Sequence, residues 1–145
     1  MERLQRRVRD YRAGYKQSMA VLVEAKRLQP SLFTKTSLLL GLGEEEAEVR
    51  QALRDLRDSG VDIITLGQYL RPTRRHMSVQ RFVPPEEFEA WREEAAGMGF
   101  AYAAAGPLVR SSYKAGELFV TGLIEGKEKE KGKDKGKIES KQAAL

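Results

Sequence analysis

The 145-residue chain has no cysteine and a single histidine, His76. Without cysteine, the chain can form no disulfide, no thiol nucleophile and no cysteine-held iron–sulfur cluster of its own. One histidine excludes a metal site built from several histidines. No run of the sequence approaches the ~18 apolar residues that a membrane-spanning helix needs. The length predicts one folded domain.

A net charge of +5 can indicate a nucleic-acid-binding protein. Here, however, most of the excess positive charge lies in one terminal segment. Residues 127–145 hold seven lysines, four acidic residues and few apolar side chains, a net charge of +3. Such a segment buries too little apolar surface to offset the entropy of ordering. We therefore predict a disordered, lysine-rich tail over 126–145 and a folded domain over 1–125. The residues before 127 carry only +2 (19 basic against 17 acidic), which argues against a nucleic-acid partner.

Hydrophobic spacing predicts three helices. One runs over 1–28 and ends before Pro30, and one runs over 44–58 and ends at Ser59-Gly60. The third begins at Pro84-Pro85 and buries a stripe made of Phe88, Trp91, Ala95 and Met98. A short extended segment over 77–83 precedes it, and a last short helix is predicted over 115–123.

Apolar runs between the helices predict three strands, a fully buried one over 33–42 and two more over 61–66 and 100–105. Strands that alternate with helices at this spacing predict an α/β fold with a parallel sheet. Three parallel strands need neighbours at their edges and cover on both faces. The pattern therefore predicts half of a larger β/α barrel, in which chemistry lies at the carboxyl ends of the strands.

Three glycine-rich segments follow the predicted strands: Gly41–Glu44, Gly67–Thr73 and Gly106–Tyr113. Gly41 and Gly43 allow either close approach of a ligand to the backbone or a tight turn. Glu44 and the two glutamates after it would repel an anion such as phosphate. The glycines are also not followed by the Lys-Ser/Thr pair of a P-loop. Gln68 and Tyr69 suit either contacts with a ligand base or packing at the barrel rim.

Two further polar segments leave alternatives open. The cluster of Arg71, Arg74, Arg75 and His76 suits either an acidic partner or an exposed basic loop. A hydroxyl of Ser111 or Ser112 can act as nucleophile, helix cap or metal ligand. The G-x-S-x-G pattern of serine hydrolases is absent around them, and a serine–histidine pair would require His76 nearby.

Three segments carry a resemblance to a known family: TKTSLLLGLGEEEAEV (34–49), LGQYLRPTRRHMSVQRFVPPEEFEAW (66–91) and GFAYAAAGPLVRSSYKAGE (99–117). Together they resemble the carboxyl-terminal half of lipoyl synthase, a radical S-adenosylmethionine family, from about Leu4 to Phe119. The lysine-rich end is more similar to mitochondrial eukaryotic members. This resemblance implies a partial parallel β/α barrel of the radical S-adenosylmethionine type.

The resemblance also implies chemistry and cofactors. Members of the family hold two 4Fe–4S clusters on CxxxCxxC and CxxxxCxxxxxC motifs. With S-adenosylmethionine they insert sulfur at C6 and C8 of a protein-bound octanoyl chain. Their partners are octanoylated lipoyl carrier proteins, namely the glycine cleavage H protein and the lipoyl domains of 2-oxoacid dehydrogenase E2, and a mitochondrial location is implied.

By the same resemblance, individual residues acquire roles. Ser112 corresponds to a serine ligand of the auxiliary cluster, and Ser111 is the less favoured choice. The cofactor-binding residues implied for S-adenosylmethionine and the adjacent site are Gly41, Gly43, Glu44, Gln68, Tyr69 and Arg110.

The sequence departs from the family because both cysteine motifs and the first half of the barrel are missing. We therefore expect this chain to be inactive alone, whether it is a fragment of a longer enzyme or a degenerate paralogue. The alternative is a non-enzymatic relative that binds lipoyl carrier domains or, less favoured, RNA. Glu2 and Asp10 argue against reading the arginine-rich start as a mitochondrial transit peptide.

Overall fold

The structure is a computed structural model, and it describes residues 1–113, which form one compact unit. The helix predicted over 115–123 and the tail predicted over 126–145 lie outside the described residues. Within the described part, no helix is long and apolar enough to cross a membrane.

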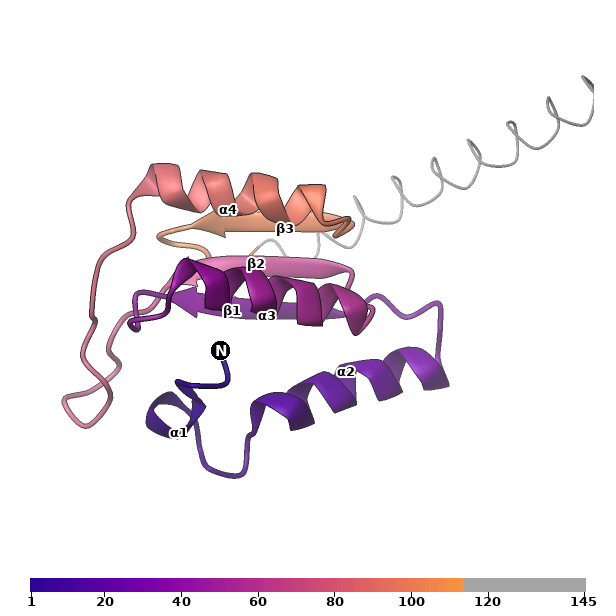
Figure 1. The fold of residues 1–145 in the computed structure, drawn as a ribbon, viewed down its shortest axis with the longest axis horizontal. Coiled ribbons are helices and arrows are strands. Elements are labelled where there is room, and N and C mark those ends of the chain that lie inside the picture. The colour runs from indigo at the N-terminus through magenta and orange to yellow at the C-terminus, as the bar shows by residue number, and fades with distance from the viewer. Residues whose placement is uncertain (114–145) are drawn as a thin grey trace, which may run out of the picture. The chain divides into compact units, whose positions relative to one another are not determined.

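A three-stranded parallel sheet forms the centre of the fold (Figure 1). Its strands are β1 (Lys35–Leu40), β2 (Ile63–Gln68) and β3 (Tyr102–Gly106), and they pair in the order β1-β2-β3. In register, Ser37 lies beside Thr65 and Thr65 lies beside Ala104. The predicted alternation and the parallel sheet are thus confirmed, because each connection returns to the start of the next strand.

Two helices connect the strands and cover one face of the sheet: α3 (Glu46–Asp58) and α4 (Pro85–Gly97) (Figure 1). The predicted stripe of α4 is confirmed, since Phe88, Trp91 and Ala95 are buried and Met98 packs against the core. The core that these helices share with the sheet consists of Leu40, Val49, Leu53, Leu56, Val61, Ile64, Leu66, Val83, Phe88, Trp91, Ala95 and Phe100.

The other face of the sheet, here called the inner face, follows from the alternation of side chains along a strand. Ile64 and Leu66 of β2 point toward the helices and belong to the core. Their neighbours Ile63, Thr65 and Gly67 therefore point the opposite way. By the same alternation, the inner face also carries Lys35, Ser37 and Leu39 of β1 and Tyr102, Ala104 and Gly106 of β3.

The prediction that the first strand is fully buried is wrong. β2 is buried over its whole length, whereas most of β1 is only half-buried and Leu39 is 40% exposed. The reason is position, because β1 lies at the edge of the described sheet and pairs with a described strand on one side only. The second strand also continues past its predicted end, through Gly67 to Gln68.

The single helix predicted over 1–28 is also wrong, because two helices occupy this region: α1 (Gln5–Val8) and α2 (Tyr15–Leu28). The break falls at Asp10, whose carboxylate accepts hydrogen bonds from the backbone N–H and the guanidinium of Arg12. This local bonding competes with the helix. Gly14 then begins α2 with extended backbone. The segment predicted to be extended over 77–83 forms no strand.

Helix α3 begins with a reciprocal cap that also binds the start of the chain. The Glu48 carboxylate accepts the backbone N–H of Glu45 at 2.9 Å, and the Glu45 side chain accepts in return. Arg3 donates two hydrogen bonds to Glu48, at 2.8 and 2.6 Å, and a third to the carbonyl of Gly43. The hydrogen bonds from Arg3 are the main reason that the pKa of Glu48 falls from 4.5 to about 2.

We predict that Glu48→Gln weakens the acid dependence of stability. The folded pKa lies below the unfolded one, so the ionised carboxylate stabilises the fold above about pH 4.5 and this contribution is lost as the pH falls toward about 2. The wild-type free energy of unfolding should therefore fall more steeply across that range than the free energy of the variant. Urea titrations at several pH values measure both slopes. Glu86→Gln, at an exposed glutamate in the first turn of α4, is the control, and equal slopes in wild type and Glu48→Gln would contradict the prediction.

Candidate functional site at the carboxyl edge of the sheet

The three predicted loop segments meet at one edge of the sheet, here called the carboxyl edge (Figure 1). Because all strands are parallel, each loop leaves the sheet on the same side. The loops after β1 and β2 are hydrogen-bonded to each other, since the backbone N–H of Tyr69 donates to the carbonyl of Leu40 at 2.7 Å and that of Gln80 donates to Gly41 at 2.8 Å. The structure thus brings Gly41, Gly43, Glu44, Gln68 and Tyr69 into one region.

Glu44 fills the turn after β1 with its own carboxylate. One carboxylate oxygen accepts the backbone N–H of Gly41 at 2.6 Å, and the other accepts that of Leu42 at 2.8 Å. Gly41 and Gly43 both have positive φ, +96° and +87°. The backbone donors that an external anion would need are therefore occupied by this buried glutamate.

The buried amide of Gln68 holds the long loop that follows β2. Its Nε2 donates to the carbonyls of Leu40, Tyr69 and Arg81 at 3.0–3.2 Å, and its Oε1 accepts the backbone N–H of Val83 at 2.8 Å. The amide therefore links the ends of β1 and β2 to the far end of the loop. This structural role was not predicted from the sequence.

Tyr69 is buried and its hydroxyl donates to the carbonyl of Met77 at 2.8 Å. Its ring forms a small apolar cluster with Leu4 and Leu42, against which Val8, Met77 and Val79 pack. The tyrosine therefore joins the loop to the segment around α1.

The segment after β3 folds back over the inner face. A Cβ atom added at Gly67 would lie 2.1 Å from the carbonyl oxygen of Val109, so only glycine permits this crossing. Arg110 donates to the carbonyls of Val109 at 2.7 Å and Pro107 at 3.2 Å. Farther along, Lys35 on the inner face donates to the carbonyl of Tyr113 at 3.2 Å.

Ser111 and Ser112 lie in the turn of this crossing segment, and both are exposed. The imidazole Nδ1 of His76 hydrogen-bonds to the Thr73 hydroxyl at 2.9 Å, and no hydrogen bond links it to either serine among the described residues. The described part thus contains no serine–histidine pair. It also contains no group of three or more His, Asp or Glu side chains that could hold a metal ion.

Thr65, a residue that sequence reasoning missed, lies at the centre of the inner face. Its hydroxyl is buried and has no hydrogen-bond partner within the described part of the chain. A buried hydroxyl without a partner is costly, so such a group is a candidate contact for a ligand or a water molecule. The available signal was a threonine inside the apolar run Ile63–Leu66.

A cavity of about 530 Å³ lies along the outer edge of β1. Its walls come from α1, α2, β1 and the loop after β2, and they are mostly apolar. Representative lining residues are Leu4, Met19, Leu22, Leu38, Tyr69 and His76. The cavity thus borders the site region at Tyr69 and extends along an edge that no described strand covers.

We predict that Gly67→Ala strongly destabilises the crossing of β2 by the Val109 segment. The added methyl group would meet a backbone carbonyl at 2.1 Å, so the segment must move away. The expected loss is at least about 1–3 kcal/mol, the usual cost of overpacking. Gly97→Ala is the matched control, because its added Cβ meets nothing within 4 Å at the end of α4. Chemical denaturation measures both, and equal midpoints for the two variants would refute the predicted crossing.

The βα units and the loops gathered at one edge define an α/β protein whose functional groups follow parallel strands. No protein-family profile matches the chain. The chain is, however, 59% identical over 127 residues to a mitochondrial lipoyl synthase of Phytophthora infestans, which is 88% of this chain and 33% of the relative.

Other relatives agree. Over 129 residues the chain is 53% identical to a mitochondrial lipoyl synthase of Drosophila melanogaster, covering 89% of this chain and 34% of the relative. Over 121 residues it is 60% identical to a chloroplastic lipoyl synthase of Zea mays, covering 83% and 34%. The chain spans about a third of the length of these relatives. Over that third it is a relative of the lipoyl synthases, and the resemblance predicted from the sequence is confirmed.

Proposed function

We propose that this chain forms the carboxyl-terminal part of a lipoyl synthase and builds one side of its active site. The complete enzyme would insert two sulfur atoms at C6 and C8 of an octanoyl chain attached to a lipoyl carrier protein. The observation that carries the proposal is the 59% identity over 88% of the chain. The parallel sheet supports it, because half of a β/α barrel of the radical S-adenosylmethionine type would have this topology.

The described residues fit a shared site, and they do not fit a complete cluster site. With no cysteine in the chain and no described cluster of three acidic or histidine side chains, the chain cannot hold a four-iron cluster by itself. When bound, S-adenosylmethionine and the two 4Fe–4S clusters of a lipoyl synthase would supply the radical and the sulfur. Alone, the chain is expected to be inactive.

Ser112 is the residue that would contribute an iron ligand. Its exposed hydroxyl is available, and it lies on a segment held in place by the Gly67 crossing and by Lys35. A serine oxygen is a harder ligand than a thiolate, so its iron would be the more easily released one. Arg110, whose guanidinium is tied to the same turn, would orient the segment or bind a carboxylate.

The carboxyl edge would bind the cofactor and the substrate. Because the side chains of Glu44, Gln68 and Tyr69 and the backbone N–H and carbonyl of Gly41 are engaged within the chain, contacts to S-adenosylmethionine here would come mainly from backbone atoms around Gly43 and from ring surfaces. The buried hydroxyl of Thr65 would offer a hydrogen bond on the inner face. The partners would be the octanoylated glycine cleavage H protein or the lipoyl domains of 2-oxoacid dehydrogenases.

The names of the relatives bear on location. The Phytophthora infestans and Drosophila melanogaster relatives are named mitochondrial, and that of Zea mays is named chloroplastic. We propose a mitochondrial location for this protein on that basis.

A chimera tests the function. In it, this chain replaces the 127 matching residues of the Phytophthora infestans enzyme. The chimera should convert octanoylated carrier protein to lipoylated product, whereas this chain alone should bind no cluster after anaerobic reconstitution. An inactive chimera that carries a full complement of iron, or stoichiometric 4Fe–4S binding by this chain alone, would contradict the proposal.

Within that chimera, Ser112→Ala should lower sulfur insertion at least about tenfold to hundredfold, the loss typical of a disturbed metal environment. It should also change the iron content of the auxiliary cluster. Ser111→Ala is the matched control, since it removes the same hydroxyl one residue earlier from an equally exposed position. Mass spectrometry of the carrier and iron analysis give the two measurements. If only Ser111→Ala lowered sulfur insertion and changed the iron content, the iron ligand would be Ser111 rather than Ser112.

A further inference from the structure

Two stretches of the chain contain arginine without any acidic residue. No Asp or Glu occurs over 63–85, which holds Arg71, Arg74, Arg75 and Arg81 as well as His76. Likewise, residues 3–9 hold Arg3, Arg6, Arg7 and Arg9 without an acid. The described structure is therefore uneven in charge, although residues 1–126 carry a net charge of only +2.

Some of these arginines have partners within the fold. Arg3 binds Glu48, Arg81 forms two hydrogen bonds of 2.6 Å with Glu87, and Arg9 donates to Ser18. Arg71 is used inside its own loop, where it donates to the carbonyls of Arg74 and His76. Of the arginines in these two stretches, four exposed ones have side chains with neither an acidic partner nor one of these other hydrogen bonds among the described residues: Arg6, Arg7, Arg74 and Arg75.

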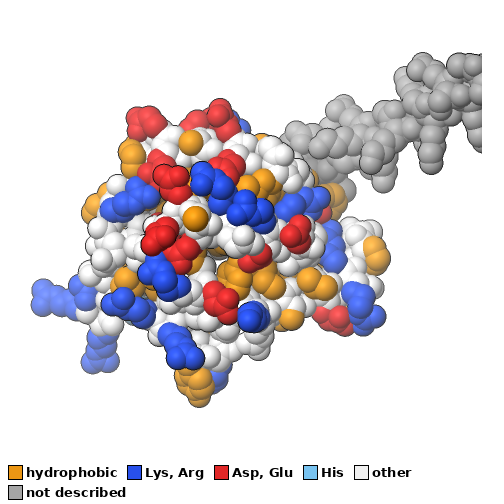
Figure 2. All heavy atoms as spheres, in the orientation of Figure 1, with side chains coloured by type: hydrophobic (Ala, Val, Ile, Leu, Met, Phe, Trp, Pro, Cys, Tyr) orange, Lys and Arg blue, Asp and Glu red, His pale blue; other side chains and the backbone are white. Residues whose placement is uncertain are grey.

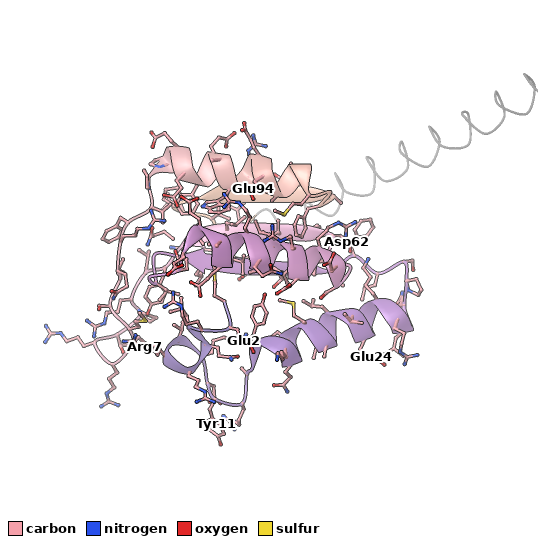
Figure 3. All side chains as sticks on the ribbon, in the orientation of Figure 1. Glu2, Arg7, Tyr11, Glu24, Asp62 and Glu94 are labelled. Carbon is pink, nitrogen blue, oxygen red and sulfur yellow. The ribbon has the colours of Figure 1, made fainter. Side chains whose placement is uncertain are left out.

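These four arginines come from segments that pack together. Val8 of α1 and Met77 of the loop contact the same apolar cluster around Leu4 and Tyr69, and Val8, Pro72 and His76 line the same cavity. Figure 3 shows Arg7 on the side of α1 where the loop lies. In Figure 2, Lys and Arg side chains project at the left edge, where Figure 1 places this loop.

Exposed apolar side chains flank the arginines of the loop. Leu70 is 51% exposed at the start of the loop, and Phe82 is 72% exposed at its end. We call the surface formed by Arg6, Arg7, Leu70, Arg74, Arg75 and Phe82 the arginine loop surface. Arginine and aromatic residues are enriched at protein–protein interfaces, whereas lysine is depleted there. No lysine occurs among residues 63–85.

Hydrogen bonds within the chain hold the loop at its base, middle and tip. Its base is fixed by Gln68, its middle by the hydrogen bond from Tyr69 to Met77, and its tip by the contact between Thr73 and His76. Binding therefore costs little ordering entropy. The loop also leaves the sheet at the carboxyl edge, so a protein bound to it would be placed beside the proposed active site.

We infer that the arginine loop surface docks an acidic face of the lipoyl carrier protein, independently of the acyl chain that the carrier bears. This inference rests on the proposed function for the identity of the partner. The surface favours a protein over a nucleic acid because two exposed apolar side chains lie at the two ends of the loop that carries Arg74 and Arg75, and the charge of residues 1–126 is close to neutral.

The first test measures binding of the full 145-residue chain to the glycine cleavage H protein, octanoylated and unmodified, by calorimetry at low salt. Both forms should bind with similar affinity, and added salt should weaken both. The charge reversal Arg74→Glu/Arg75→Glu should weaken binding about tenfold or more, since like charges would then face each other. The control Arg27→Glu/Arg54→Glu changes the net charge equally at exposed sites on α2 and α3, and should change the affinity by less than about twofold.

A second variant separates the apolar contribution from charge. Phe82→Ala should weaken binding several-fold without lowering the unfolding midpoint, because the ring is already in solvent. Leu28→Ala, at a side chain 69% exposed at the end of α2, is the matched control and should leave the affinity unchanged.

The outcomes distinguish docking from the proposed function. Equal weakening by the two charge-reversal pairs, binding only of the octanoylated carrier, or tighter binding of an RNA homopolymer than of the carrier would each overturn the inference. In the active chimera, Arg74→Glu/Arg75→Glu should raise the KM for carrier and leave kcat nearly unchanged. An unchanged KM there would reject docking while the proposed function stands, whereas an inactive chimera with intact carrier binding would reject only the function.

Discussion

The carboxyl edge of this fold depends on the buried amide of Gln68. It satisfies backbone groups at the end of β1, at the end of β2 and at the far end of the long loop. The amide fits only because position 41 is glycine, where an added Cβ would lie 2.3 Å from Nε2 of Gln68. Without these bonds, the carbonyl of Tyr69 and the backbone N–H of Val83, both in buried residues, would lose these partners, at a cost of about 1–3 kcal/mol for each group left unpaired. The position of the loop thus depends on the side chain of Gln68 and on the absence of a side chain at Gly41.

The same arrangement divides the polar groups of the edge into two sets. The side chains of Glu44, Gln68 and Tyr69 form hydrogen bonds with backbone groups of the loops themselves. The buried hydroxyl of Thr65 on the inner face has no hydrogen-bond partner among the described residues, and Ser112 in the crossing segment is exposed. Groups of the first kind shape the site, and groups of the second kind are free to meet a ligand. A side chain at a strand end is therefore not a ligand contact by position alone.

The sequence predicted the repeating pattern better than the particular contacts. The parallel sheet, α3 and α4 followed from periodicity, since their apolar stripes are buried in the expected way. The break at Asp10 was missed because a local side-chain hydrogen bond outweighs a helical spacing that continues through it. The exposure of Leu39 was missed because a run of leucines does not reveal which strand lies at an edge. The candidate residues Gly41, Glu44, Gln68 and Tyr69 were correctly gathered at one edge, but their mutual hydrogen bonds depend on tertiary distances that spacing cannot supply.

The hydrogen bonds that shape the carboxyl edge come from this chain alone. Gln68, Glu44, Tyr69 and the Gly67 crossing involve no group that a metal cluster would provide. The polar groups that position these loops are therefore supplied within the chain. The loop of the arginine loop surface is likewise anchored by Gln68 and Tyr69, which lie on a different segment from Ser112. Under the proposed roles, recognition of a carrier protein and ligation of iron would be carried by separate segments, one after β2 and one after β3, so that either property could be altered by mutation without loss of the other.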